Sequence, residues 1–181
     1  MILTMRTILI PALAALVLAA CNGTTAPITG DYEPLPADQV LTGVTHHMTV
    51  EGVRTAKLLS DTTYVYDDSA AIQLRGVNLE LYTETGAVRA YLTSETGELD
   101  TGTNRMVSRG SVVLIVQGPN GRTVRTEELH YDPQQKRIWS TVTTCDKPTG
   151  SGERCGDSFE SDDQFQNFRI SRPRGAVELV F

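Results

Sequence analysis

Hydrophobic and polar residues alternate along much of the chain after Gly43, and no useful length there has the 3.6-residue spacing of an amphipathic helix. In residues 77–81, Val77, Leu79 and Leu81 share one strand face, while Asn78 and Glu80 share the opposite face and should meet water. Residues 112–116 are almost continuously apolar, which indicates a strand that is buried on both faces or lies at a tight spot. The pattern predicts an all-β domain.

Turn-forming residues separate these candidate strands at regular intervals. They fall at 66–69, 85–86, 100–104, 118–121 and 132–135, and they include Gly, Pro, Asn and Asp in the combinations that favour tight turns. Short strands separated by turns about every ten residues are typical of a sandwich, a barrel or a roll.

A weak internal repeat refines this prediction. An apolar residue followed by aspartate occurs at Tyr66-Asp67, Leu99-Asp100 and Tyr131-Asp132, at intervals of 33 and 32 residues. Two copies then place a glycine, Gly76 or Gly110, before an alternating strand. A unit of strand, turn, strand and glycine bend cannot bury its apolar face alone, so it must stack on its neighbours. We expect an elongated stack of antiparallel strands.

The N-terminus reads as an export signal. Residues 8–20 form an apolar run that is too short to span a bilayer, and it ends in Leu18-Ala19-Ala20-Cys21, which resembles the lipobox of bacterial lipoproteins. We predict a signal peptide over residues 1–20, lipidation of Cys21, a flexible tether over residues 21–37, and one domain over residues 38–181. The alternative is an ordinary signal-peptidase site followed by an unrelated cysteine.

The other two cysteines, Cys145 and Cys155, bracket a stretch rich in turn formers. In an oxidising compartment an even pair of cysteines favours a disulfide. Two free thiols, or half of a metal site, are the alternatives. No other cysteine or suitably spaced histidine completes a metal site, so we predict none.

The remaining chemistry is sparse. The formal net charge of −6, without a basic stripe, argues against nucleic-acid binding. The adjacent pair His46-His47 would point to opposite faces of a strand and so would not share a metal. The acidic residues between 157 and 163 lack the spacing of a calcium loop and read as solvated charge. We find no nucleophile motif or phosphate-binding loop, and we predict a non-enzymatic protein without a cofactor.

Six stretches, in order, resemble one protein family. They are GVRTAKL (52–58), LRGVNLELY (74–82), GSVVL (110–114), LHYD (129–132), IWS (138–140) and GDSFESD (156–162). Together they are similar to the lipopolysaccharide-export family LptC over residues 40–175, in its lipoprotein-anchored form. LptA and the N-terminal domain of LptD share such strand repeats. No stretch is specific alone, so the resemblance rests on their order.

The resemblance implies a twisted, open β-jellyroll whose apolar inner faces hold the acyl chains of lipopolysaccharide in the periplasm. It implies two protein partners, an inner-membrane ABC transporter that loads the lipid and an LptA-like bridge protein that extends the roll. The chain departs from the family by carrying Cys21 in place of a transmembrane helix, and the family does not lead us to expect a bridge between Cys145 and Cys155. Because Asn22 follows Cys21, the sequence leaves open whether the inner or the outer membrane holds the anchor.

Two sites follow from the alternation and the resemblance. We expect a lipid-binding groove lined by Val77, Leu79, Leu81, Val112, Leu114, Val116, Phe159 and Ile170. We also expect the short apolar strand Val177, Glu178, Leu179, Val180 and Phe181 to be an edge to which a partner adds a strand. The alternative function is a structural lipoprotein with a filled β core that scaffolds partners and carries no lipid.

Overall fold

The structure is a computed structural model that describes residues 37–174, and all regular secondary structure in that range is β-strand. The strands are β1 (Gln39–Val50), β2 (Val53–Val65), β3 (Ala71–Tyr82), β4 (Val88–Asp100), β5 (Met106–Val116), β6 (Arg122–Asp132), β7 (Arg137–Ser140), β8 (Thr144–Pro148), β9 (Arg154–Gly156), β10 (Ser158–Asp162) and β11 (Arg169–Ser171). Within residues 37–174, no helix is long and apolar enough to cross a membrane.

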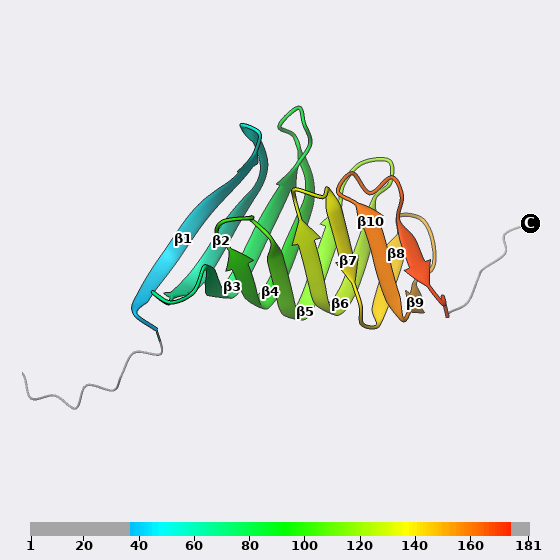
Figure 1. Cartoon of the computed structure of the whole chain (residues 1–181). Coiled ribbons are helices and arrows are strands. Elements are labelled where there is room, and N and C mark those ends of the chain that lie inside the picture. The colour runs from blue at the N-terminus through cyan, green and yellow to red at the C-terminus, as the bar shows by residue number, and fades with distance from the viewer. Residues whose placement is uncertain (1–36, 175–181) are drawn as a thin grey trace, which may run out of the picture. The chain divides into compact units, whose positions relative to one another are not determined.

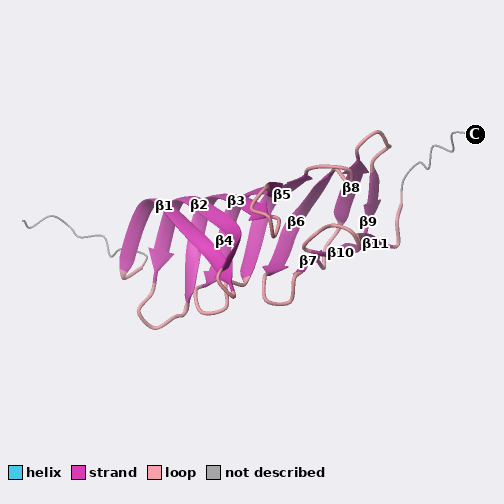
Figure 2. Ribbon diagram, turned by 90° about the horizontal axis from the view of Figure 1, so that it is seen from above, coloured by secondary structure: helices cyan, strands magenta, loops and turns pink. Residues whose placement is uncertain are grey.

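The strands form a single antiparallel sheet in which β1 to β7 are neighbours in chain order, followed by β10 and β11. Figures 1 and 2 show them succeeding one another from β1 at one end to β11 at the other. β7 and β8 both pair with β6, and β9 pairs with β8. β7 and β8 therefore form the two halves of one longer strand beside β6, and β10 and β9 form the two halves of the next one. The predicted all-β stack of antiparallel strands is confirmed.

The long strands bend at their middle, where the pairing register skips a residue. Between β2 and β3, Ser60 pairs with Val77 and Thr62 pairs with Arg75, so Asp61 and Gly76 are left out of the register. Equivalent gaps cross β1 at Gly43, β4 at Glu95, β5 at Gly110 and β6 at Glu127. Together these residues make a bend line that runs across the sheet.

Glycine is required on this bend line for two reasons. Gly76 and Gly110 have φ of +62° and +77°, a left-handed backbone that side chains with a Cβ rarely adopt. A Cβ at position 76 would also collide with the carboxylate of Asp61 on the neighbouring strand, and a Cβ at 110 would lie 2.8 Å from Glu95 Oε2. Both glycines predicted as bends therefore lie where the sheet folds over.

Folding along the bend line creates two layers. Layer 1 contains residues 44–50, 53–60, 77–82, 88–94, 112–116 and 122–126 with β8 and β9, and layer 2 contains residues 39–42, 62–65, 71–75, 96–100, 106–109 and 128–132 with β7, β10 and β11. In β3 the buried positions change phase at the bend, because Leu74 and Val77 are both inward. The inward side chains of both layers join one hydrophobic cluster, so the layers face each other across a shared core.

The repeated aspartates mark turns at the free end of layer 2. Asp100 Oδ1 accepts bonds from the backbone N–H groups of Gly102 and Thr103, and Asp132 Oδ1 accepts bonds from those of Gln134 and Gln135. Asp67 lies in the equivalent turn between β2 and β3. The sequence repeat thus corresponds to one pair of bent strands.

A fourth copy of this turn went undetected in the sequence. Asp162 ends β10, 30 residues after Asp132, and its Oδ1 accepts a bond from the N–H of Gln166 at 2.8 Å. The copy is hard to see in the sequence because serine, not an apolar residue, precedes it.

One strand prediction was wrong in part. Residues 112–116 in β5 alternate like their neighbours, with Val112, Leu114 and Val116 inward, whereas Ile115 is 43% exposed on the outer face. The apolar outer residues are covered by no second layer within residues 37–174. Apolar composition therefore misidentified a strand that is buried on one face only.

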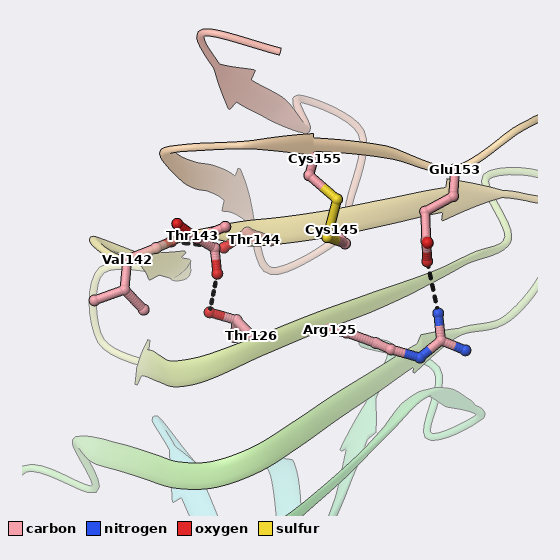
Figure 3. The surroundings of a disulfide bond; sticks show 8 residues. All are labelled: Arg125, Thr126, Val142, Thr143, Thr144, Cys145, Glu153 and Cys155. Atoms are coloured by element: carbon pink, nitrogen blue, oxygen red, sulfur yellow. Dashed lines mark hydrogen bonds and ion pairs between the residues drawn. A yellow bond between two sulfur atoms is a disulfide. The ribbon is translucent and has the colours of Figure 1, made fainter. Parts of the chain in front are cut away.

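Cys145 and Cys155 are joined by a disulfide between β8 and β9, as predicted (Figure 3). The two residues are direct partners in the antiparallel register. Beside the bridge, Arg125 of β6 pairs with Glu153 at 2.8 Å, which ties the loop between β8 and β9 to β6. The disulfide fastens the last strands of layer 1 together.

Several predicted features lie outside the described residues. These are the signal peptide over residues 1–20, the lipidation site Cys21, nearly all of the tether and the partner edge strand from Val177 to Phe181.

Candidate functional site

The predicted groove residues line the inner surface, with one at its margin. Val77, Leu79 and Leu81 of β3 and Val112, Leu114 and Val116 of β5 all lie on the inner face of layer 1, and none is more than 4% exposed. Phe159 of β10 is equally buried on the inner face of layer 2. Ile170 of β11 pairs with Phe159 in register but is only half-buried, near the end of the sheet.

The sheet register aligns these side chains across the strands. Leu58, Leu79, Leu92, Leu114 and Val124 are successive partners from β2 to β6. Strands lie about 4.8 Å apart, so this apolar row is about 19 Å long and runs perpendicular to the strands. The direction follows from the stacking of bent strands, and an extended acyl chain could follow the same direction.

At the end nearest β8, the apolar row meets charged side chains. The next partner after Val124 is Asp146 of β8, which is fully buried. Its Oδ2 accepts bonds from Arg122 at 3.4 Å and from Arg154 at 3.1 Å. Burial lowers the pKa of the Arg122 guanidinium, and Asp146 opposes that shift.

The inner space is filled in this structure. Leu74, Leu99, Met106, Leu129 and Ile138 of layer 2 belong to the same cluster as the predicted groove residues. Phe165, from the loop 163–168 between β10 and β11, inserts into the cluster and is 1% exposed. Its φ of +57° is unusual for a residue with a large side chain. The inner faces therefore pack on each other and on this aromatic ring.

The layers meet again at their free ends, opposite the bend line, where a row of cross-layer contacts closes a mouth. Glu84 in the β3–β4 turn pairs with Lys136 in the β6–β7 turn at 3.3 Å. Arg122 of layer 1 lies over the ring of Phe168 of the 163–168 loop, 4.1 Å from its centroid. A cavity of about 250 Å³ lies at this mouth, lined by residues that include Val53, Tyr82, Pro133 and Asp163. Polar contacts bridge the mouth, so the apolar interior has a polar rim.

A polar group lies just inside this rim. Arg89 of β4 is 6% exposed and faces Asp163 of layer 2 at 4.0 Å. The phenol of Tyr131, on the inner face of β6, has no hydrogen-bond partner in the part of the chain that the structure describes. Burial raises its pKa to about 12. The sequence does not mark Arg89 as inward, because an inward-facing polar residue breaks the alternation and reads as solvent-facing. Tyr131 is recognisable there only as part of the repeat, and Phe165 lies in a loop without periodicity.

The acidic residues between 157 and 163 have separate roles. Asp157 pairs with Arg172 and Arg174, Glu160 pairs with Arg137, and Asp162 caps its turn. Asp163 is 7% exposed, which corrects its reading as solvated charge. Within residues 37–174, no group of three or more His, Cys, Asp or Glu side chains is placed to hold a metal ion.

The outer face of layer 2 carries a connected polar network. Arg109 bonds Glu128 at 2.9 Å, Glu128 bonds His130 at 2.8 Å, and the His130 ring stacks on Trp139 with centroids 5.0 Å apart. Hydrogen bonding from His130 lowers the pKa of Glu128, although partial burial opposes the shift. This face is held together by contacts among its own side chains.

Comparisons with known proteins agree with this architecture. The family described as "Lipopolysaccharide-assembly, LptC-related" matches residues 12–148. The solved structure of LptH, "the LptA homologous periplasmic component of the conserved lipopolysaccharide transport device from Pseudomonas aeruginosa", is similar with a TM-score of 0.52 and 17% identity, covering 69% of this chain and 87% of that one. No curated protein matches the chain. At this identity LptH supports the fold alone, whereas the family match spans most of the chain and includes β1 to β8. The chain therefore belongs to the LptC-related family of lipopolysaccharide-assembly proteins.

Proposed function

We propose that this protein is a periplasmic lipopolysaccharide-binding component of the export machinery, and that it passes the lipid along the inner surface of its jellyroll without catalysing a reaction. The observation that carries the proposal is the apolar row from Leu58 to Val124, which crosses five strands inside a sheet whose described part ends in the unpaired edges of β1 and β11. Membership of the LptC-related family supports lipopolysaccharide as the ligand.

The packed interior defines how acyl chains bind. They replace contacts that the two layers and Phe165 now make with one another, so the mouth has to open. The contacts that close it are few and mostly polar, such as the exposed pair of Glu84 and Lys136. An exposed ion pair contributes about 0–1 kcal/mol, so opening this contact costs little. Apolar area lost between the layers is regained against the lipid.

The lipid moves passively in this proposal. An inner-membrane ABC transporter supplies the energy and loads the lipid, and an LptA-like protein receives it by adding a strand to the edge at residues 177–181. Cleavage after residue 20 and lipidation of Cys21 hold the protein on the periplasmic side of a membrane, and the proposal allows either the inner or the outer membrane.

Photo-crosslinking tests the groove. A photoreactive amino acid at position 79, which faces inward, should crosslink to lipopolysaccharide, whereas the same amino acid at the neighbouring position 78, which faces outward, should not. Far-ultraviolet circular dichroism on both variants checks that each is folded. Equal labelling at the two positions, or labelling at position 78 alone, would rule out the groove and favour a filled-core scaffold that carries no lipid.

Replacing Cys21 by Ser tests the anchor. It removes the proposed acylation site, and because each buried methylene contributes about 0.8 kcal/mol, loss of the acyl chains should release the protein or leave it unprocessed. Processed Cys21→Ser protein that still fractionates with membranes would exclude the lipid anchor.

A further inference from the structure

Arg89 is an unusual residue for the inside of a β-jellyroll. Leu81 pairs with Ala90 and Tyr82 pairs with Val88, so Arg89 is the extra residue of a β-bulge at the start of β4. The bulge turns its side chain inward, where it is 6% exposed. Among the described residues, its Nε and Nη1 atoms have no hydrogen-bond partner. Two donor groups of a buried cation are therefore free.

The nearest carboxylate does not satisfy this guanidinium. Arg89 Nη2 lies 4.0 Å from Asp163 Oδ2, which is beyond hydrogen-bond distance. The other oxygen of Asp163 accepts a bond from Gln164 Nε2 at 3.1 Å. The second carboxylate nearby, Asp162, is occupied by the backbone of Gln166 and the side chain of Asn167. Burial lowers the pKa of Arg89, and Asp163 only opposes that shift.

Two other inward hydroxyls in layer 2 are equally unpartnered. Tyr131 Oη and Ser161 Oγ are buried and make no hydrogen bond within residues 37–174, although the Thr55 side chain lies near the Tyr131 phenol. Tyr131 pairs with Ile138, which pairs with Ser161, so the two hydroxyls lie on the same inner row, two strands apart. Phe165 lies against the guanidinium, 5.7 Å from its carbon to the ring centroid. Arg89 of layer 1 and Tyr131 of layer 2 thus lie near each other beside the 163–168 loop, and Ser161 lies on the same inner row as Tyr131.

The fold does not explain this arrangement. Leaving buried donors without partners is unfavourable, and an apolar residue at position 89 would avoid that cost. An anion that accepts several hydrogen bonds would satisfy the free donors of Arg89 and the two hydroxyls together.

The position of Arg89 indicates which anion. It lies where the apolar interior meets the polar mouth, since Asp163 both faces the guanidinium and lines the mouth cavity of about 250 Å³. An amphiphile with its acyl chains along the apolar row would have its headgroup at this boundary. We propose that Arg89, with Tyr131 and Ser161, binds a phosphate group on the headgroup of the lipid carried between the layers. This inference rests on the proposed lipid-carrier function.

Binding measurements on matched ligands and variants test the site. The ligands are lipid A with its phosphate groups, lipid A from which they have been removed, and inorganic phosphate alone. The protein is the purified chain, compared with Arg89→Met and with Arg125→Met, which removes an equal charge from the outer surface. Wild type and Arg125→Met should bind phosphorylated lipid A about tenfold or more tightly than the dephosphorylated form, because charge-assisted hydrogen bonds are lost with the phosphate. Arg89→Met should bind both forms alike.

Thermal unfolding separates a binding role from a folding role. Because Arg89 is buried without adequate partners, Arg89→Met should melt at or above the wild-type temperature. Arg89→Lys keeps the charge but not the planar fork of donors, and should retain part of the preference for phosphorylated lipid. A melt of Arg89→Met several degrees below wild type would assign Arg89 to the fold and overturn the proposal.

The other outcomes are also distinguishable. If wild type binds both forms of lipid A equally, the phosphate site is wrong while the lipid carrier stands. If it binds neither form, the carrier function itself fails. If inorganic phosphate saturates wild type but not Arg89→Met, and the two lipid A forms bind alike, the site takes free phosphate and the headgroup assignment is overturned.

Discussion

Substitution of Gly76 by alanine tests whether the bend line depends on glycine. Alanine at a left-handed φ of +62° costs about 1–2 kcal/mol. The new methyl group also meets the Asp61 carboxylate, which is exposed and can rotate away at about 0.5–1.5 kcal/mol if it leaves its preferred rotamer. Gly76→Ala should therefore lower the free energy of unfolding by about 1.5–3.5 kcal/mol, combining these two ranges.

Two comparisons separate the backbone cost from the collision. Gly86 has a φ of +85° in an exposed turn with open space around it, so Gly86→Ala should carry the backbone cost alone. In an Asp61→Ala background the two shortest contacts, which are with the carboxylate, are gone, and Gly76→Ala should cost about 0.5–1.5 kcal/mol less. Urea unfolding followed by circular dichroism measures all five proteins, including wild type. If Gly76→Ala is as stable as wild type, or if the two sites show no coupling, the account of the bend line is refuted.

Three further predictions concern other parts of the chain. Cys145 and Cys155 are ten residues apart, so replacing both by serine should cost about 2.7 kcal/mol in the chain-entropy treatment, and equal melting of wild type and variant would contradict this. Burial favours the protonated phenol of Tyr131 and raises its pKa to about 12, so its contribution to stability is full below pH 10 and is lost as the pH rises through about 12. Tyr131→Phe should remove this loss of stability at alkaline pH, and an unchanged fall in stability above pH 10 would contradict the prediction. Deleting residues 177–181 should weaken capture of an LptA-like partner in a pull-down without changing the melt, and full capture would exclude that edge.

The sequence predicted the parts of the fold that depend on local chemistry. Alternation of side chains placed Val77, Leu79 and Leu81 on one face, and the Asp100 and Asp132 turns are held by bonds within a few residues of each aspartate. Gly76 and Gly110 were recognisable as bends because few other residues tolerate that backbone. Each of these features is determined by a short stretch of chain.

The rest depends on contacts between distant residues. The pairing of layers brings Arg89 to Asp163, which lies 74 positions later, and no local pattern marks either residue as inward. Phe165 enters the core from a loop, where an isolated aromatic residue reads as surface. Ile115 was misplaced because apolar character does not distinguish a covered face from an exposed one. The inward positions of the strands were therefore predictable, while the insertion of Phe165 and the buried charge of Arg89 were not.

The stacking of bent strands also determines how the domain loses structure. Among the described strands, β1 has one neighbour, β2, and the central strands β3 to β5 each have two, so stability is distributed as in a linear array with nearest-neighbour coupling. Opening should begin at the terminal strands and propagate inward, and amide hydrogen exchange should be slowest in β3 to β5. At the far end, the disulfide between β8 and β9 restrains this fraying, while β1 has no covalent restraint within residues 37–174. The β1 end should therefore be the faster-exchanging of the two.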